Sequence, residues 1–256
     1  MSRTIVFVGH GTRLKQGIDE WLGFVRGVVR AADLRPHQSR YAFIELESPS
    51  VEEVLIELGK TRHHDVILVP TLLFSAGHMK WDLPQAVERA MRRTKPLCVN
   101  ILQPFGTEAS FLDVGVDRAY EAVCGWRGGE STGVVFVARG NQDVEAQCSF
   151  QDVVMCIARA LSHRVDNVLV EAAYLAGSGR SLEAAMESLA RQGVRRIAVI
   201  PYLWFSGMLT YTLPKRVERW RQTVATVEVK LGRHLGCDSR LITTVAERVR
   251  NVLGIT

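Results

Sequence analysis

Several classes of protein are excluded by what the 256-residue chain lacks. No apolar run reaches the roughly 18 residues that a membrane span requires, so we expect no membrane segment. The N-terminus runs from one short apolar stretch straight into Gly9-His10-Gly11 and has no small-residue cleavage site. This predicts a first strand and not a signal peptide. We therefore expect a soluble protein of the cytoplasm.

The chain also has few cysteines, and their spacing excludes common cysteine-based frameworks. There are five, an odd number, and no two are spaced C-x-x-C. This pattern argues against a disulfide scaffold, a zinc ribbon and an iron–sulfur cluster. We expect most of the cysteines to be small apolar core residues in a reducing compartment. They are Cys98, Cys124, Cys148, Cys156 and Cys237.

A basic stripe with interleaved aromatic residues, which would indicate nucleic-acid binding, is missing as well. The chain contains no long block of lysines and arginines, and it has no nucleotide-binding motif. We therefore expect no nucleic-acid partner. The net charge of +5 is positive all the same, and it permits an anionic small-molecule substrate.

Two copies of one sequence unit make up the chain. The apolar stretch before Gly11 recurs before Gly140, and segment 70–75 recurs as 201–206. Further matches follow in the same order, and all offsets lie between 129 and 131 residues. They pair Gly77 with Gly207, Leu83-Pro84 with Leu213-Pro214, and Val87-Glu88-Arg89 with Val217-Glu218-Arg219. Two copies are too few for a solenoid, so they indicate duplication of a whole domain.

The duplication suggests domain boundaries and a fold class. We expect an N-terminal domain over 1–124, a polar, Gly-rich linker over 125–133 and a C-terminal domain over 134–256. Short apolar runs alternate with amphipathic stretches in each copy. The predicted strands are 5–8, 41–44, 66–69 and 97–102, then 134–137, 167–171, 197–200 and 227–231. The predicted helices of the first copy are 15–32, 51–60, 83–93 and 108–123. Strand–helix alternation predicts an α/β protein with two tandem flavodoxin-like domains, each a parallel sheet of about four strands flanked by helices.

Three polar residues follow three predicted strands of the first copy. His10 comes directly after the first strand, Glu45 closes the second, and His78 lies in the loop after the third. In a flavodoxin-like order the first strand lies between the second and third, so these loops meet at one edge of the sheet. Two imidazoles and a carboxylate there predict a site that binds a divalent metal or moves protons.

Each of these residues also has an ordinary structural interpretation, and the second copy helps to weigh it. His10 could cap a helix, Glu45 could be a surface residue with Glu47 as a competitor, and His78 could be a solvated loop histidine. Their counterparts in the second copy are Arg139, Ala176 and Met208, so all three are replaced where the scaffold residues persist. This joint loss favours one functional site in the first copy. We expect the second copy to serve as a lid or wall of the site, with Arg139 available as an anion contact.

At these residues the chain resembles the long-form sirohydrochlorin chelatases, the class II chelatases of siroheme and cobalamin synthesis. The matching motifs are Val8-Gly-His-Gly-Thr-Arg13, Phe43-Ile-Glu-Leu-Glu-Ser-Pro49, Val69-Pro-Thr-Leu-Leu-Phe-Ser-Ala-Gly-His78 with Asp82-Leu-Pro84, and Pro201-Tyr-Leu-Trp-Phe-Ser-Gly-Met-Leu209. The usual serine of the first motif is Thr12 here, which keeps the hydroxyl. A histidine-rich tract and a C-x-x-C near the C-terminus are absent, so the chain looks more like the iron-inserting members than the cluster-bearing, cobalt-inserting ones.

The resemblance implies metal insertion into sirohydrochlorin, the last step of siroheme synthesis, with Fe²⁺ as the first candidate metal and Co²⁺ as the alternative. It implies metal binding by His10 and His78, with Glu45 as their acidic partner and a further candidate ligand. Which group is ligand and which is base stays open at this point. The metal would be a substrate, and no permanently bound cofactor is expected.

Sirohydrochlorin carries eight carboxylates, which suits a basic chain. The candidate carboxylate contacts are Arg13, Lys15, Lys80 and Arg139. Because the duplication supplies both halves in one chain, we expect a monomer. Two other functions remain as alternatives. One is a non-catalytic tetrapyrrole or metal carrier with the same site. The other is a histidine phosphatase, disfavoured because Gly9 stands where an arginine would clamp the phosphate.

Overall fold

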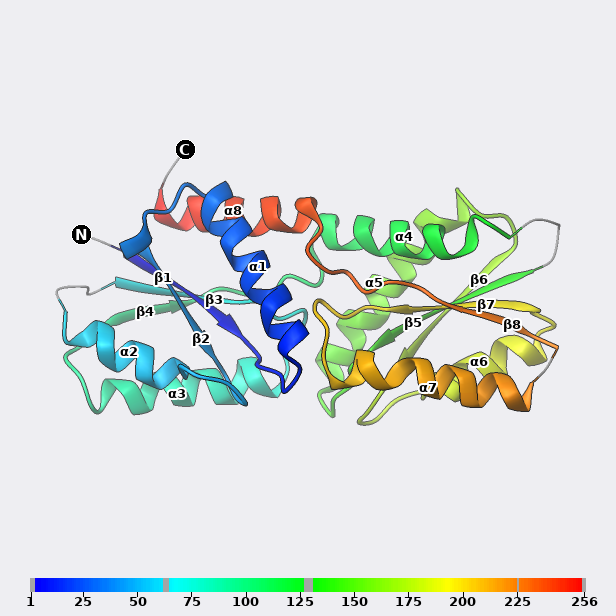
Figure 1. Cartoon of the computed structure of the whole chain (residues 1–256), viewed down its shortest axis with the longest axis horizontal. Coiled ribbons are helices and arrows are strands. Elements are labelled where there is room, and N and C mark those ends of the chain that lie inside the picture. The colour runs from blue at the N-terminus through cyan, green and yellow to red at the C-terminus, as the bar shows by residue number, and fades with distance from the viewer. Residues whose placement is uncertain (1–2, 62–64, 127–130, 225, 255–256) are drawn as a thin grey trace. The chain divides into compact units, whose positions relative to one another are not determined.

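A computed structural model describes residues 3–61, 65–126, 131–224 and 226–254, and it contains two parallel four-stranded sheets. The strand orders are β2-β1-β3-β4 and β6-β5-β7-β8 (Figure 1). The first strand of each sheet therefore lies between the second and third, as predicted. The expected α/β class with two tandem four-stranded units is confirmed.

The elements agree closely with the predicted segments. The first sheet contains β1 (Arg3–Gly9), β2 (Ser39–Phe43), β3 (Asp65–Pro70) and β4 (Cys98–Ile101), and the second contains β5 (Thr132–Ala138), β6 (Val168–Tyr174), β7 (Arg196–Pro201) and β8 (Glu228–Leu231). The α-helices are α1 (Lys15–Ala31), α2 (Val51–Gly59), α3 (Leu83–Met91), α4 (Ala109–Val123), α5 (Val144–Ser162), α6 (Leu182–Arg191), α7 (Met208–Thr223) and α8 (Ser239–Leu253). A short 3₁₀ turn, η1 (Pro36–Gln38), precedes β2, and a π-helical turn, η2 (His78–Asp82), precedes α3.

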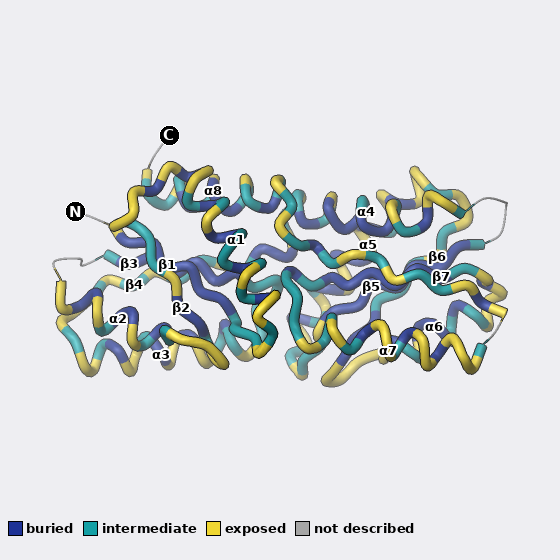
Figure 2. Tube along the Cα trace, viewed as in Figure 1, coloured by how far each residue is buried: buried dark blue, intermediate teal, exposed yellow. Residues whose placement is uncertain are grey.

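Both sheets are buried on their two faces, which explains why their strands are continuous apolar runs. In β1 the residues alternate between faces, and Val6 and Val8 pack in one cluster with Leu55 of α2 and Leu83 of α3. The opposite face of this sheet is covered by α1 and α8 (Figure 1). Figure 2 shows the consequence, with buried strands inside and helices that are exposed on their outer side.

The compact units do not follow the two sequence copies. One unit comprises Met1–Phe105 with Ser239–Thr256, and the other comprises Gly106–Asp238. The last helix of each copy is exchanged, because α4 packs against α5 and β7 while α8 packs against α1. The division therefore differs from the predicted domains 1–124 and 134–256. Part of the predicted linker, residues 127–130, lies outside the described residues.

Glycines allow the exchanged helices to pack closely in their units. Gly115 in α4 permits the approach of α5, because an added Cβ would come within 2.7 Å of Ile157. Gly27 in α1 does the same for α8, where Ile242 would lie 2.9 Å from a Cβ. We call the unit that contains β1–β4 the first unit and the one that contains β5–β8 the second unit.

The expectation that most of the cysteines are core residues is wrong, since all five are exposed. Cys148 and Cys156 lie on the outer side of α5, and Cys98 begins the edge strand β4. Cysteine is on average a buried residue type, but these five positions do not face the apolar core. Among the described residues, none of the helices is both long enough and apolar enough to cross a membrane.

Candidate metal site

The three predicted site residues meet at the carboxyl edge of the first sheet. His10, Glu45 and His78 each offer one ligand atom, and these atoms all lie within 4.8 Å of one another. The Nε2 atom of His10 is 3.4 Å from Oε1 of Glu45. The rings of His10 and His78 are perpendicular, with centroids 4.5 Å apart. Three donors at such distances can converge on one cation.

A tight turn after β1 positions His10. Gly9 allows the side chain of Trp21 to pack against the end of the strand, since an added Cβ would lie 2.8 Å from that indole. Gly11 adopts a φ of +93°, a conformation that favours glycine. The Nδ1–H of His10 donates to the Gly11 carbonyl over 2.9 Å. With Nδ1 engaged by the backbone, Nε2 is the ring nitrogen that faces Glu45.

Backbone hydrogen bonds hold Glu45 beside that turn. The Ile44 N–H donates to the Gly9 carbonyl at 2.9 Å, and the Glu45 N–H donates to the His10 carbonyl at 3.1 Å. The pairing of β1 and β2 therefore continues beyond the two strands to His10 and Glu45, up to the site. The Glu45 side chain is 43% exposed, so it can exchange protons with solvent. Glu47, the competitor in sequence, is not part of the cluster.

His78 is oriented by a residue that the sequence reasoning did not single out. Its Nδ1 lies 2.7 Å from Oδ2 of Asp82, one turn further along η2. A carboxylate that accepts the Nδ1 proton fixes the ring and makes Nε2 a better metal ligand. The spacing of four residues was a usable signal, because on a helical turn it brings two side chains to one side.

A buried threonine fixes the start of the loop that carries His78. The Thr71 N–H and hydroxyl both donate to the Val8 carbonyl at 2.9 Å, and the same hydroxyl accepts from Trp21 Nε1 at 2.7 Å. Thr71 is 5% exposed, so these bonds are shielded from water. The loops after β1 and β3 are thereby tied together, which holds the two histidines in register.

The second unit repeats the turn without the ligands. The Leu175 N–H donates to Ala138 and the Ala176 N–H donates to Arg139, both over 2.9 Å. These bonds pair the same backbone positions as those at Gly9 and His10. They place Arg139 and Ala176 as the counterparts of His10 and Glu45, and Gly140 has a φ of +86° like Gly11. The conformation of the turn therefore does not depend on the metal-binding side chains.

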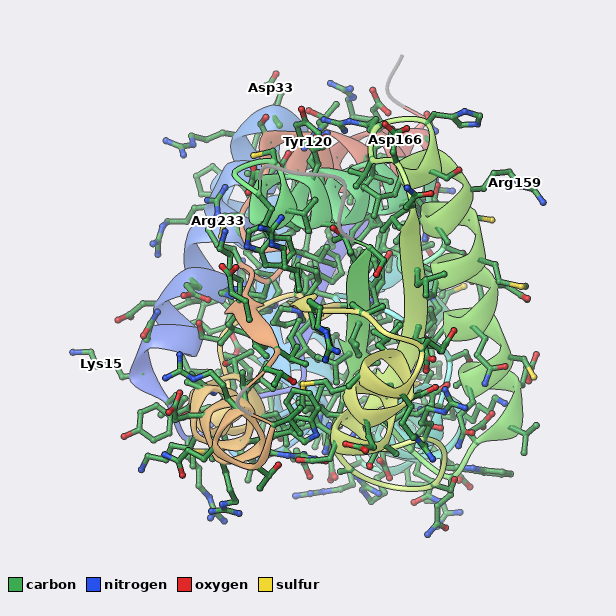
Figure 3. The ribbon with its side chains drawn as sticks, turned by 90° about the vertical axis from the view of Figure 1, so that its right-hand side faces the viewer. Lys15, Asp33, Tyr120, Arg159, Asp166 and Arg233 are labelled. Atoms are coloured by element: carbon green, nitrogen blue, oxygen red, sulfur yellow. The ribbon has the colours of Figure 1, made fainter. Side chains whose placement is uncertain are left out.

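The predicted carboxylate contacts are more dispersed. Arg13 is exposed just before α1, and Lys15 extends outward from the first turn of that helix (Figure 3). Lys80 is partly buried in η2, two residues after His78. Arg139 is exposed at the corresponding strand end of the second unit.

The donor set indicates the metals that the site can hold. Imidazole nitrogen suits divalent iron, cobalt, nickel and zinc, and one carboxylate adds charge without enclosing the ion. Three protein donors leave open coordination positions, so a bound ion can be passed to another ligand. Fold and site together define a duplicated α/β protein that, among the described residues, has a candidate metal site in its first unit.

Comparison with known proteins agrees with this class. The CbiX family profile matches residues 4–122 and again residues 133–252, so the chain belongs to the CbiX family. A sirohydrochlorin ferrochelatase of Priestia megaterium is 28% identical over 97% of this chain and 90% of its own length. A sirohydrochlorin cobaltochelatase of the same organism is 24% identical over 98% of this chain and 80% of its own. The solved structure of SirB from Bacillus subtilis with Fe³⁺ superimposes with a TM-score of 0.77 at 25% identity, covering 99% of this chain and 98% of SirB.

Proposed function

We propose that this protein is a sirohydrochlorin chelatase that inserts a divalent metal, Fe²⁺ in the first place, into sirohydrochlorin and releases two protons. The observation that carries this proposal is the convergence of His10, Glu45 and His78 within 4.8 Å at the edge of the first sheet. Membership of the CbiX family and the names of the full-length relatives support the same reaction.

The hydrogen bonds of the two histidines suggest how the roles are divided. In both rings Nδ1 is engaged, by Gly11 in one and by Asp82 in the other, so both Nε2 atoms are available to the metal. Two imidazoles bind Fe²⁺ or Co²⁺ without a change of redox state. Glu45 then serves as the base that accepts the pyrrole protons as the ring nitrogens take the metal. Its exposure gives those protons a route to solvent.

The choice of iron over cobalt rests on two observations. The ferrochelatase of Priestia megaterium is slightly more similar than the cobaltochelatase of that organism, at 28% against 24% identity. The chain also has no histidine-rich tract and no C-x-x-C. Cobalt insertion for cobalamin synthesis is the second candidate, because the cobaltochelatase matches over nearly the whole chain.

An anaerobic metallation assay tests the proposal. Purified protein is mixed with sirohydrochlorin and either Fe²⁺ or Co²⁺, and the macrocycle absorbance is followed against a protein-free control. We expect acceleration with both metals and a higher kcat/KM with Fe²⁺. Tight binding of sirohydrochlorin with no acceleration by either metal would instead identify a tetrapyrrole carrier.

The remaining expectations belong to the same proposal. Arg13, Lys15 and Lys80 supply positive charge to the substrate carboxylates from the first unit, and Arg139 does so from the second. The protein acts in the cytoplasm as a monomer without a permanently bound cofactor. Sedimentation of the metal-free protein checks the oligomeric state, and a mass of one chain is the expected result.

A further inference from the structure

Leu46 is an apolar residue that follows the candidate ligand Glu45 directly and remains half exposed, at 50%. Its Cβ lies 3.5 Å from the position that a Cβ on Gly11 would take. Leu46 therefore sits against the turn that carries His10, at the border of the metal site. It does not belong to the apolar cluster formed by Ile44 and the residues of α2 and α3.

The backbone of Leu46 is strained. Its φ is +67°, in the left-handed region that leucine rarely adopts. Two other described non-glycine residues have a positive φ, and both are of types whose short polar side chains tolerate it, namely Asp33 and Asn167. Leu46 is the exception, and such outliers are concentrated at functional sites.

The second unit shows what the turn itself requires. The counterpart of Leu46 is Gly177, with a φ of +74°. A Cβ there would also come within 2.9 Å of the Asn141 backbone, so that turn is closed around a glycine. The first unit keeps the same backbone conformation but leaves room for a large apolar side chain. A glycine is sufficient for this turn, so the fold does not require the strained backbone or the exposed side chain of Leu46.

Exposure alone would not single out a residue at this edge. Trp81 in η2 is 65% exposed, but its counterpart Tyr211 in α7 is 62% exposed, so an exposed aromatic side chain is common to both units. Leu46 differs from Trp81 because it combines exposure with a strained backbone and a glycine counterpart. Among the residues that the structure describes, this combination occurs in the unit that carries the candidate metal ligands.

We propose that Leu46 is a substrate-binding residue whose side chain packs against the apolar face of the tetrapyrrole during metal insertion. The inference rests on the proposed function, because metal transfer requires the centre of the ring to approach the ion held by His10 and His78. The carboxylates of sirohydrochlorin lie at the ring periphery, so groups beside the ligands face its apolar interior. Burial of the exposed half of a leucine side chain there strengthens binding.

The test compares Leu46→Gly, which copies the second unit, with Leu46→Asn, which keeps a residue type suited to positive φ. The matched control is Leu169→Asn, at an exposed leucine near the start of the edge strand β6. The dissociation constant of metal-free sirohydrochlorin is measured by tryptophan fluorescence, Co²⁺ binding without tetrapyrrole by absorbance, and unfolding by calorimetry.

We expect both Leu46 variants to weaken sirohydrochlorin binding by about fivefold, with unchanged Co²⁺ affinity. Leu46→Gly should also raise the unfolding midpoint by about 2 °C, because the strain is relieved. A residue needed only for the fold would show the reverse, a lower midpoint with normal affinity, and that result overturns the proposal. If the Leu46 variants bind sirohydrochlorin as tightly as the wild type, and the wild type metallates the ring, the role of Leu46 is refuted while the proposed function stands. If the wild type binds the ring but does not metallate it, the proposed enzymatic function is refuted and the role of Leu46 in binding is not.

Discussion

The two units end their first strands in the same turn, but they use that turn for different purposes. In the first unit it presents His10 beside Glu45, and in the second the same backbone bonds present Arg139 beside Ala176. The second unit keeps the backbone of the turn and lacks the three candidate ligands of the first. Turn geometry and metal chemistry can therefore be altered separately in this chain.

A second contrast concerns the carboxylate in the first turn of the helix after each second strand. Glu52 of α2 is bound by Arg89 and Arg93, which joins two helices at the surface. Its counterpart Glu183 of α6 accepts two bonds from Arg216, and the same guanidinium donates to the Leu175 carbonyl at 2.8 Å. In the second unit Arg216 thus holds the backbone at Leu175 by a hydrogen bond. The counterpart of Leu175 in the first unit is Ile44, beside the candidate metal site.

The largest effect is expected from making the first unit like the second. The triple change His10→Arg, Glu45→Ala and His78→Met should abolish metallation, and His10→Ala or His78→Ala alone should lower kcat/KM at least about 100-fold. Because the turn is kept without these side chains in the second unit, circular dichroism and the unfolding midpoint should not change. His163→Ala, at the end of α5, removes a histidine elsewhere as a control. Normal activity of both single variants would refute the site.

Asp82 should have a smaller effect that acts through His78. Asp82→Asn leaves the size of the side chain but weakens its hold on the Nδ1 proton, so metal affinity should fall about 10- to 100-fold. Nitrogen NMR of the His78 ring should show a mixture of tautomers in the variant and one in the wild type. If the affinity falls but the tautomer is unchanged, Asp82 serves the fold and not the ligand.

Rebuilding the site in the second unit tests the comparison from the other side. The changes are Arg139→His, Ala176→Glu, Met208→His and Thr212→Asp, which copy His10, Glu45, His78 and Asp82. Since the backbone bonds at the positions of His10 and Glu45 already match, we expect a second Co²⁺ site. It should be about tenfold weaker than the first, because Met208 begins an α-helix where His78 begins a π-helical turn. Titration should give two Co²⁺ per chain. A stoichiometry of one would mean that more than the four side chains distinguishes the units.

The sequence was enough to predict both sheets and the convergence of His10, Glu45 and His78 at one edge, and the reason is local. Parallel strands buried on both faces are continuous apolar runs, and the residues that follow three neighbouring strands must meet at one edge. The counterparts of His10 and Glu45 were found by offset, and the backbone bonds of the second unit confirm them. These features depend on chain order alone, so no long-range packing had to be known.

Packing decided what the sequence did not predict. Both sheets offer a similar apolar face, so periodicity predicted α4 as a helix but could not assign it to a sheet. The strain at Leu46 depends on a backbone angle that composition does not report. The cysteines were misplaced for a related reason, because a residue's average burial says little about which side of a helix it occupies.

The smallest effect is expected from Arg216, which bonds to the backbone at the end of β6 in the second unit. Arg216→Met removes the bonds to Glu183 and Leu175, and because the pair is partly exposed the loss in unfolding free energy should be about 1 kcal/mol. Arg216 holds the pKa of Glu183 below its ordinary value. The pair therefore stabilises the fold above the ordinary carboxyl pKa, and this stabilisation is lost as the pH falls through the lowered pKa. Denaturation at neutral and acidic pH should show a difference in unfolding free energy between variant and wild type that shrinks on acidification.

The matched control is Arg221→Met, which breaks the exposed pair with Glu218 and should have almost no effect at either pH. An equal loss of unfolding free energy in both variants would mean that the hydrogen bond to the Leu175 carbonyl contributes nothing to stability. The difference between the strand ends at Leu175 and Ile44 would then not affect stability.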